Sequence, residues 1–491
     1  MSNTTPSFKP TLSLWDGTMI VAGSMIGSGI FIVSADITRN VGSAGWLIAI
    51  WLITGFMTLT AALSYGELSS MFPKAGGQYV YLKEAYNPLM GFLYGWSFFA
   101  VIQTATIAAV GVAFSKFLAY LVPELGNNYF LFDLRLDTRW QEQAGIIKIN
   151  SGQLVSIVII CLLTFINSRG VKEGKFIQTL FTSAKLLALF GLIVFGFLLV
   201  KNSFWAENWQ TGFNAIQDLG IKDNKDVLHP TTWKEISGAA LMGAIAAAMV
   251  GSIFSSDAWN NVTFIAGEMK NPQRNIGLSL FLGTGLVTLI YVSANLMYLN
   301  VLPLQEIAYA AEDRVAVAAA NKIFPDVGTY VIAVLIMVST FGCNNGLIMA
   351  GARVYYTMAK DGLFFKKAGE LNSVSVPQTA LWIQATVASI WSLSGKYGQL
   401  LDMISFVVVL FYMLTIIGIF ILRKKRPDAD RPYKAFGYPL LPALYILLGA
   451  TFCILLIQYK PEFTWPGLII VLLGVPLYYL AISRNKGTAV S

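Results

Sequence analysis

Residues 23–29 of the 491-residue chain read GSMIGSG, which places three glycines and two serines within seven positions of an otherwise apolar stretch. Each glycine costs a helix about 1 kcal/mol relative to alanine. A second interruption follows at residues 251–260, GSIFSSDAWN. Close packing between membrane helices would explain the first stretch alone. Two such interruptions, in the first and the sixth predicted helix, favour helices that unwind near the middle of a membrane.

The composition excludes a chain of water-soluble domains. Hydrophobic residues make up 56% of the chain and charged residues 12%, with a mean hydropathy of +0.63. A soluble protein carries about 25% charged residues. The apolar residues form blocks near the length of about 20 residues that crosses a hydrocarbon core of about 30 Å. We therefore predict an all-α polytopic membrane protein embedded in the lipid bilayer.

The apolar blocks predict twelve transmembrane helices, the fourth of them shorter than ideal. They lie near residues 14–36, 44–70, 91–122, 153–168, 176–200, 237–268, 276–302, 326–358, 377–395, 401–422, 438–457 and 464–483. Lys and Arg favour alternate connections, most densely after the tenth span, so both termini are expected in the cytoplasm. We expect a cytoplasmic tail at residues 1–13, a single transmembrane domain at 14–483 and a second tail at 484–491.

Several classes of function are disfavoured. The net charge of +8 is spread over short connections, so nucleic-acid binding is not expected. One histidine (His229) and three distant cysteines (Cys161, Cys343, Cys453) give no metal-ligand spacing, and we expect no metal and no cofactor. The chain lacks GxxxxGK[ST], so it has no motif for an ATP-driven pump.

The predicted breaks supply the chemistry of a binding site. Unwound backbone cannot face lipid, so it must line a cavity or bind a ligand. Free N–H groups around Ser28 and Gly29, at the positive end of a half-helix, suit a carboxylate. Carbonyl groups near Met25, Phe254 and Ser255 suit an ammonium group. Together they suit the zwitterion of an α-amino acid, which Phe254 either covers or merely packs beside.

Two ionisable residues lie inside apolar blocks. Lys185 is about 15 Å into the fifth span, near the midplane, where a lysine costs from ~3 to more than 10 kcal/mol. We expect its ammonium to act as a fixed cation near the carbonyls of the first break, in place of a dissociable metal ion. Asp257, in the sixth span, would attract a cationic side chain, move protons or accept backbone hydrogen bonds. Neither Lys116 nor Glu67, both near span ends, is assigned a transport role.

The sequence resembles the amino acid–polyamine–organocation superfamily, most closely its L-type amino acid transporter branch and the bacterial relatives of that branch. The resemblance covers nearly the whole chain. It is carried by GSMIGSGIF at 23–31, YGELSSMFPKAGGQYVY at 65–81, NSRGVK at 167–172, WNNVTFIAGEMKNPQRN at 259–275, RVYY at 353–356 and the Arg431-Pro432 region.

The resemblance implies a LeuT-like fold, with a five-plus-five inverted repeat (about 14–200 and 237–422), two further helices (about 438–483), and helices 1 and 6 unwound at the midplane. It implies that Ser28 and Gly29 hold the substrate carboxylate, and that Met25, Phe254, Ser255 and Asp257 surround its amino group. Lys185 matches a lysine near the sodium position of sodium-coupled relatives, which implies sodium independence.

Two departures from the family pattern matter. Animal light chains join a heavy chain through a cysteine in the loop after the third span, and residues 123–152 contain none, so no disulfide-linked heavy chain is expected. Cys343 stands where several relatives carry a serine close to the lysine. Thr340, three residues earlier on the same helical face, is the expected substitute for that contact.

Together these observations predict a permease of the bacterial inner (plasma) membrane that moves L-amino acids by alternating access. We expect it to work without sodium, by exchange or by proton-coupled uptake. A non-transporting amino acid sensor would keep the same pocket. A membrane-embedded enzyme is disfavoured by the lack of a histidine-centred or metal-ligand constellation.

Overall fold

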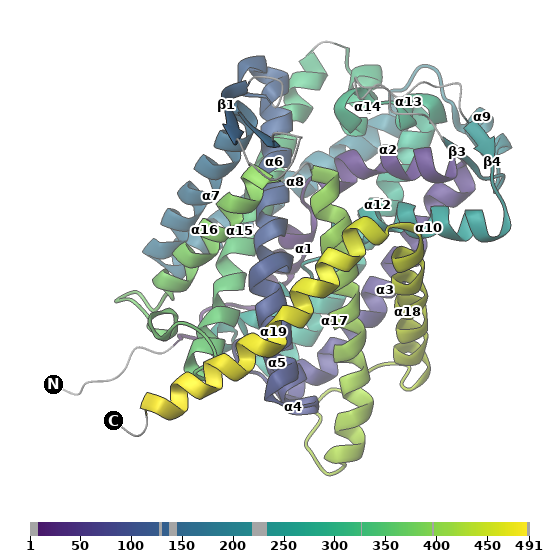
Figure 1. The fold of residues 1–491 in the computed structure, drawn as a ribbon. Helices are drawn as coiled ribbons and strands as arrows, with labels where there is room; N and C mark the ends of the chain where they lie inside the picture. The colour runs from purple at the N-terminus through teal and green to yellow at the C-terminus, as the bar shows by residue number, and fades with distance from the viewer. Residues whose placement is uncertain are drawn as a thin grey trace.

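The computed structural model describes residues 8–126, 130–136, 145–218, 233–325, 327–394 and 397–488. Long helices form the body of the molecule, and short helices and strands gather at one end of it (Figure 1). The first half of the chain contains α1 (Leu14–Met25), α2 (Gly29–Val41), α3 (Ala44–Met71), α4 (Gln78–Ala85), α5 (Pro88–Ser97), the π-helix η1 (Phe98–Ile102), α6 (Gln103–Leu121), η2 (Pro123–Leu125), β1 (Phe130–Leu136), β2 (Gly145–Asn150), α7 (Ser151–Arg169), α8 (Val171–Leu198), α9 (Trp205–Gln210), β3 (Ile216–Asp218) and β4 (Trp233–Glu235).

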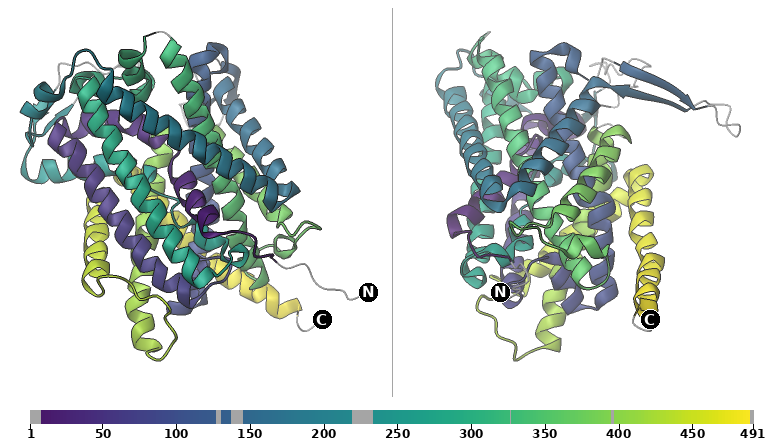
Figure 2. Two further views of the ribbon diagram at one scale, coloured as in Figure 1. Left: turned by 180° about the vertical axis from the view of Figure 1, so that it is seen from behind. Right: turned by 90° about the vertical axis from the view of Figure 1, so that its left-hand side faces the viewer.

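The second half follows with α10 (Gly238–Ser255), α11 (Asn261–Phe264), η3 (Ala266–Glu268), α12 (Pro272–Val301), α13 (Leu304–Ala308), η4 (Ala311–Asp313), α14 (Val315–Ile323), α15 (Val327–Lys360), η5 (Lys366–Gly369), α16 (Gln378–Ser394), α17 (Tyr397–Lys425), α18 (Leu440–Tyr459) and α19 (Pro461–Thr488). Two antiparallel strand pairs, β1–β2 and β3–β4, lie in the connections and were not predicted. The β1–β2 pair extends away from the helices (Figure 2). His229 and parts of both predicted tails lie outside the described residues.

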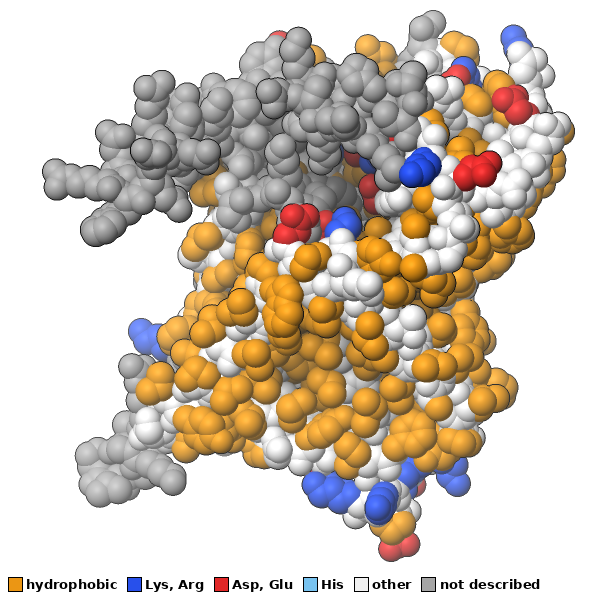
Figure 3. Space-filling model, turned by 45° about the vertical axis from the view of Figure 1, so that its right-hand side comes forward, with side chains coloured by type: hydrophobic (Ala, Val, Ile, Leu, Met, Phe, Trp, Pro, Cys, Tyr) orange, Lys and Arg blue, Asp and Glu red, His pale blue; other side chains and the backbone are white. Residues whose placement is uncertain are grey.

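The surface supports a membrane-embedded body. Side chains that face outward from the helices are apolar, such as Leu187, Leu198 and Leu440, each more than 70% exposed. On the face drawn in Figure 3 a broad belt of hydrophobic side chains lies between two ends that carry the charges. This distribution is that of a protein whose middle meets lipid. The chain is an integral membrane protein.

Both predicted breaks have a local cause. A capping box between Ser13 and Asp16 starts α1, which ends at Met25, and α2 begins at Gly29 with its axis bent by 41° from α1. In the second stretch, α10 ends at Ser255, and Ala258 takes a positive φ of 62° that no helix allows. Each break falls where the sequence concentrates glycine, serine and aspartate.

The described helices do not confirm the expected count of twelve spans. Among the described residues, ten helices are long and apolar enough to cross a membrane, or eleven if α1 and α2 form one span. The described part of α16 has 17 residues, fewer than the roughly 20 that a span needs. The sixth predicted span, 237–268, contains α10 and the 4-residue α11 on either side of the non-helical residues 256–260. The count of twelve stays a prediction.

Candidate functional site

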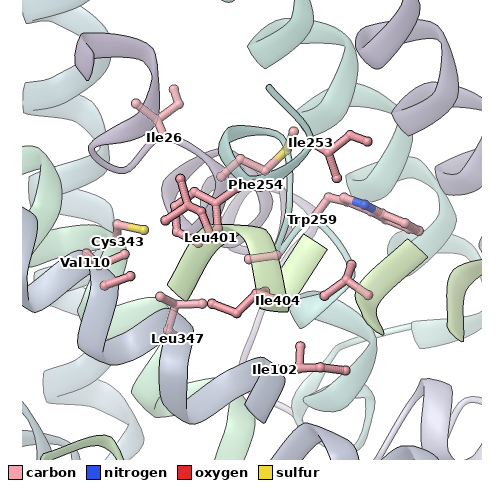
Figure 4. Close-up of a cluster of buried hydrophobic side chains, with 14 of the residues drawn as sticks. Ile26, Ile102, Val110, Ile253, Phe254, Trp259, Cys343, Leu347, Leu401 and Ile404 are labelled. Carbon is pink, nitrogen blue, oxygen red and sulfur yellow. The ribbon is translucent and has the colours of Figure 1, made fainter. Parts of the chain in front are cut away.

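The two breaks meet inside the bundle and enclose a cavity. Gly29 lies directly against Ser255, because a Cβ on Gly29 would stand 2.6 Å from the Ser255 Cβ. The space beside this contact is about 280 Å³ when open solvent is included, and about 10 Å³ of it is reachable by the centre of a water-sized sphere. Its lining comes from both breaks and from α6 and α15: Ser24, Met25, Gly27, Ser28, Gly29, Thr106, Val110, Phe254, Ser255, Asp257, Ala258, Cys343 and Leu347. Figure 4 shows the apolar side chains of this region, among them Val110, Phe254 and Leu347.

The expected site residues fall into two groups. The cavity brings together the six residues expected to bind substrate and also Cys343. Lys185 and Thr340 do not line it. The cavity is therefore a candidate ligand site made largely of backbone from the two breaks, and Lys185 lies behind its wall.

Lys185 is fully buried, and its ammonium group is surrounded by carbonyl oxygens. Its Nζ donates to the Gly23 oxygen at 2.7 Å, to the Ile26 oxygen at 2.6 Å and to the Ser339 oxygen at 3.2 Å. An ammonium group has three protons, so three carbonyls use them all. Two of these carbonyls belong to the first break. The lysine thus ties the end of α1 to α15.

Thr340 does not make the contact expected of it. Its hydroxyl donates to the Ile336 and Met337 carbonyls of its own helix. Ser339 takes that place instead, through its carbonyl on Lys185 and through its hydroxyl, which lies 3.3 Å from the Ile26 oxygen. Ser339 is four residues before Cys343 and shares its helical face.

Tyr291 on α12 is a central residue that the sequence reading missed. Its hydroxyl is 2.9 Å from the Met25 oxygen and 2.9 Å from the Ser255 oxygen, so one side chain contacts both breaks. Asn295 bonds Ser34 at 2.7 Å, and the Tyr298 hydroxyl bonds the Ile30 oxygen at 3.2 Å. Tyr291, Asn295 and Tyr298 follow the i, i+4, i+7 spacing of one helical face, a signal that was present in the sequence.

Side chains of other helices donate hydrogen bonds to the carbonyl groups at the C-terminal end of α1. Helix ends carry four carbonyls without intrahelical partners, and these are costly when buried. The acceptors are the oxygens of Gly23 (from Lys185), Ser24 (from the Cys343 thiol at 3.0 Å), Met25 (from Tyr291) and Ile26 (from Lys185). A carbonyl oxygen has two lone pairs, and those of Met25 and Ile26 each accept a second hydrogen bond, from the Gly27 N–H at 2.8 Å and from the Ser339 hydroxyl at 3.3 Å.

Asp257 lies between this cavity and a second one. The Tyr412 hydroxyl donates to its carboxylate. The second cavity, in which about 10 Å³ is reachable by the centre of a water-sized sphere, is lined by Asp257 and by polar side chains that include Gln78, Gln103, Asn260 and Asn261. Asn261 is 1% exposed, and its amide nitrogen has no hydrogen-bond partner among the described residues. Asp257 is thus a carboxylate that both cavities share.

Glu67 is buried in an ion-pair cluster and lines neither cavity. Its carboxylate accepts two hydrogen bonds from Arg423, at 3.0 and 2.7 Å, and one from the Ala435 backbone at 2.7 Å. Arg431 lies 3.4 Å from the same carboxylate. These contacts indicate a structural role for Glu67. Within the described ranges, no three His, Cys, Asp or Glu side chains gather in a way that could hold a metal ion.

Comparison with known proteins identifies relatives of the whole chain. Residues 12–480 match the family described as amino acid permease. The large neutral amino acids transporter small subunit 2 of Homo sapiens is 29% identical over 479 residues, covering 97% of this chain and 81% of the relative. The b(0,+)-type amino acid transporter 1 of Mus musculus is 27% identical over 493 residues, covering 99% and 90%. The Asc-type amino acid transporter 1 of Mus musculus is 27% identical over 479 residues, covering 97% and 82%.

Proposed function

Because this chain belongs to the amino acid permease family, we propose that it carries L-amino acids across a cell membrane by alternating access, without sodium, by exchange or with protons. The family relatives are amino acid transporters, so the chain is a permease and not an enzyme. The observation that carries the proposal is the cavity whose wall is formed by the backbone of two helix breaks. Such a wall suits a small zwitterion, because the breaks place backbone N–H and carbonyl groups beside the same space.

We assign the substrate's backbone to this cavity. Its carboxylate binds the N–H groups of Ser28 and Gly29 at the start of α2, and its ammonium group binds carbonyls near Met25, Phe254 and Ser255, with Asp257 close by. The contact between Gly29 and Ser255 supports this assignment, since it brings the donor and acceptor ends within one small ligand's reach. The side chain of the substrate extends past Asp257 toward the second cavity and Asn261.

Lys185 supports the proposed independence from sodium. Its ammonium group already gives the carbonyls of Gly23 and Ile26 a positive partner. A dissociable cation at the same carbonyls would meet like charge at short range. We further propose a permease of the bacterial inner membrane with both termini in the cytoplasm and two inverted repeats. Residues 123–152 lack cysteine, which supports the absence of a disulfide-linked heavy chain.

Uptake into proteoliposomes tests the function. The common amino acids compete against a radiolabelled one, with and without internal substrate, with and without a pH gradient, and with choline in place of sodium. We expect accumulation that survives choline and that rises with internal substrate or with the proton gradient. Binding without accumulation would favour a sensor, and strict sodium dependence would contradict the role given to Lys185.

Asp257→Asn tests how the substrate side chain is read. If the carboxylate attracts a cationic side chain or moves protons, the variant lowers transport of cationic amino acids, or its pH response, by about tenfold, equal to ~1.4 kcal/mol. The measurement is the competition panel repeated across pH. Asp428→Asn, at an exposed position after α17, is the matched control. An unchanged substrate profile and pH response would leave Asp257 with hydrogen bonding alone.

A further inference from the structure

Two neighbouring charged residues at one end of the molecule reach toward different helices. Asp313 and Arg314 connect η4 to α14, at the end opposite α4 and the N-terminus (Figure 1). Glu312 and Asp313 have φ angles of 55° and 61°. Side chains other than glycine rarely adopt this left-handed backbone, so the turn is strained and needs contacts on both sides to hold it.

Asp313 holds the far end of α2. Its Oδ1 lies 2.7 Å from an Arg39 guanidinium nitrogen, which also donates to the Ala308 oxygen at 2.6 Å. The Arg39 side chain is 15% exposed, so this pair is screened only in part by water. Arg39 is in the last turn of α2, and the first residue of α2, Gly29, lines the cavity. A 13-residue helix is about 20 Å long and moves as a rod.

Arg314 reaches α6 instead. One of its guanidinium nitrogens donates to the Lys116 oxygen at 3.3 Å, and the group lies 5.3 Å above the Tyr120 ring. The same helix supplies Thr106 and Val110 to the cavity lining. Consecutive residues of one strained turn therefore tie together α2 and α6, which form two walls of the candidate site.

We propose that Asp313 and Arg314 form a clasp that closes the substrate cavity toward the face of α13 and α14, and that separation of Arg39 from Asp313 opens this face. The inference rests on the proposed transport function. With Arg39 released, α2 turns about residues 26–28, where its axis already departs from that of α1 by 41°. The strained turn relaxes at the same time, so the closed state persists only while both contacts are made.

A native cysteine reports on this opening. Cys343 lines the cavity and is 3% exposed in the closed structure. With Cys161→Ala and Cys453→Ala in the background, Cys343 is the one thiol in the chain. A membrane-impermeant methanethiosulfonate is applied to proteoliposomes from each face in turn, and the rate of labelling is measured on intact full-length protein.

Asp313→Asn removes the charge with little change in size. We expect labelling from the α13–α14 face to rise at least fivefold and labelling from the opposite face to fall. Glu306→Gln is the matched control, because Glu306 pairs with Lys322 at 3.1 Å on the same end of the molecule, with both side chains about 45% exposed and no contact to Arg39. This control should label like the parent.

Arg39→Lys provides a second variant, since it keeps the charge but cannot hold Asp313 and Ala308 with one planar group. It should label faster than the parent and more slowly than Asp313→Asn. If Cys343 in either folded variant is labelled from both faces at the rates of the parent protein, the clasp is overturned. If the parent fails to transport amino acids, the proposed function fails, yet a shift in labelling would still support the clasp as the closure of a binding cavity.

Discussion

Three carbonyl oxygens take the place of water around the Lys185 Nζ inside an apolar bundle. Counting residues along the fifth span predicts that Lys185 lies near the midplane, and its depth in the membrane stays a prediction. The partner on α15 could not be predicted, since adjacent faces of that helix offer Ser339 and Thr340 and only packing decides which meets the lysine. Tyr291 shows the same limit: its spacing with Asn295 was visible, but its reach to both breaks depends on how α12 crosses them.

Lys185→Ala should impair transport by about a hundredfold or more, because it leaves two carbonyls of the first break without their charged donor, at ~1.5–3 kcal/mol for each bond. Uptake is measured beside thermal unfolding and monodispersity. Lys201→Ala, at an exposed position after α8, is the control. Transport at the parent rate in a folded Lys185→Ala protein would remove the fixed cation from the account.

Tyr291→Phe should weaken substrate binding roughly tenfold. The change deletes only the hydroxyl that contacts the Met25 and Ser255 carbonyls, so the two breaks lose a shared donor worth ~1–2 kcal/mol. Affinity is measured by scintillation proximity on purified protein. Tyr355→Phe is a matched control, since the buried Tyr355 hydroxyl has no hydrogen-bond partner among the described residues. Equal losses in both variants would mean that tyrosine packing, not the bridge, matters.

At the scale of elements, the positions of the helix breaks follow from local sequence, whereas the lengths of the helices do not. Glycine and serine at 23–29 disfavour a helix wherever they occur, so a break there could be anticipated. The apolar block at 237–268 continues past its polar centre, and hydropathy alone cannot tell one long helix from α10 followed by the 4-residue α11. The β1–β2 pair was missed because these two short segments, although rich in apolar residues, do not show by their spacing that they pair with each other.

Gly29→Ala should reduce substrate affinity at least tenfold while the protein still folds. An added Cβ would lie 3.0 Å from the Ser255 Cα and 2.6 Å from the Ser255 Cβ. Because one of these is a backbone atom, the clash is relieved only if α2 moves away from α10. Gly285→Ala is the matched control, because its nearest neighbour is 3.8 Å away. Binding and thermal unfolding are compared for both. Unchanged affinity in Gly29→Ala would show that the two breaks need not touch.

At the scale of the whole molecule, contacts between distant parts of the chain hold the helices in place, and these are the contacts that sequence patterns leave open. Glu67 looked like an ordinary span-end carboxylate, yet its partner Arg423 is 356 positions away. The basic segment after α17 was interpreted as an orientation signal. Two of its arginines also neutralise a buried carboxylate on α3, a task that only the assembled bundle reveals.

Glu67→Ala should destabilise the protein by about 3 kcal/mol, because it leaves Arg431, with a side chain 8% exposed, beside an empty acceptor site. We expect the thermal midpoint in detergent to fall by about 5 °C. Glu84→Ala is the control, since its pair with Arg426 is 32% and 42% exposed and such pairs contribute at most ~1 kcal/mol. Similar midpoints for both variants would contradict the assigned structural role.

Binding of blocked amino acids to the purified protein tests the central claim most directly. A substrate found in the uptake panel is compared with its N-acetyl form and with its carboxamide, which remove one charge each and leave the side chain intact. If the two breaks grip both ends of a zwitterion, each blocked form binds at least a hundredfold more weakly than the parent amino acid. Equal affinity for either blocked form would contradict the account.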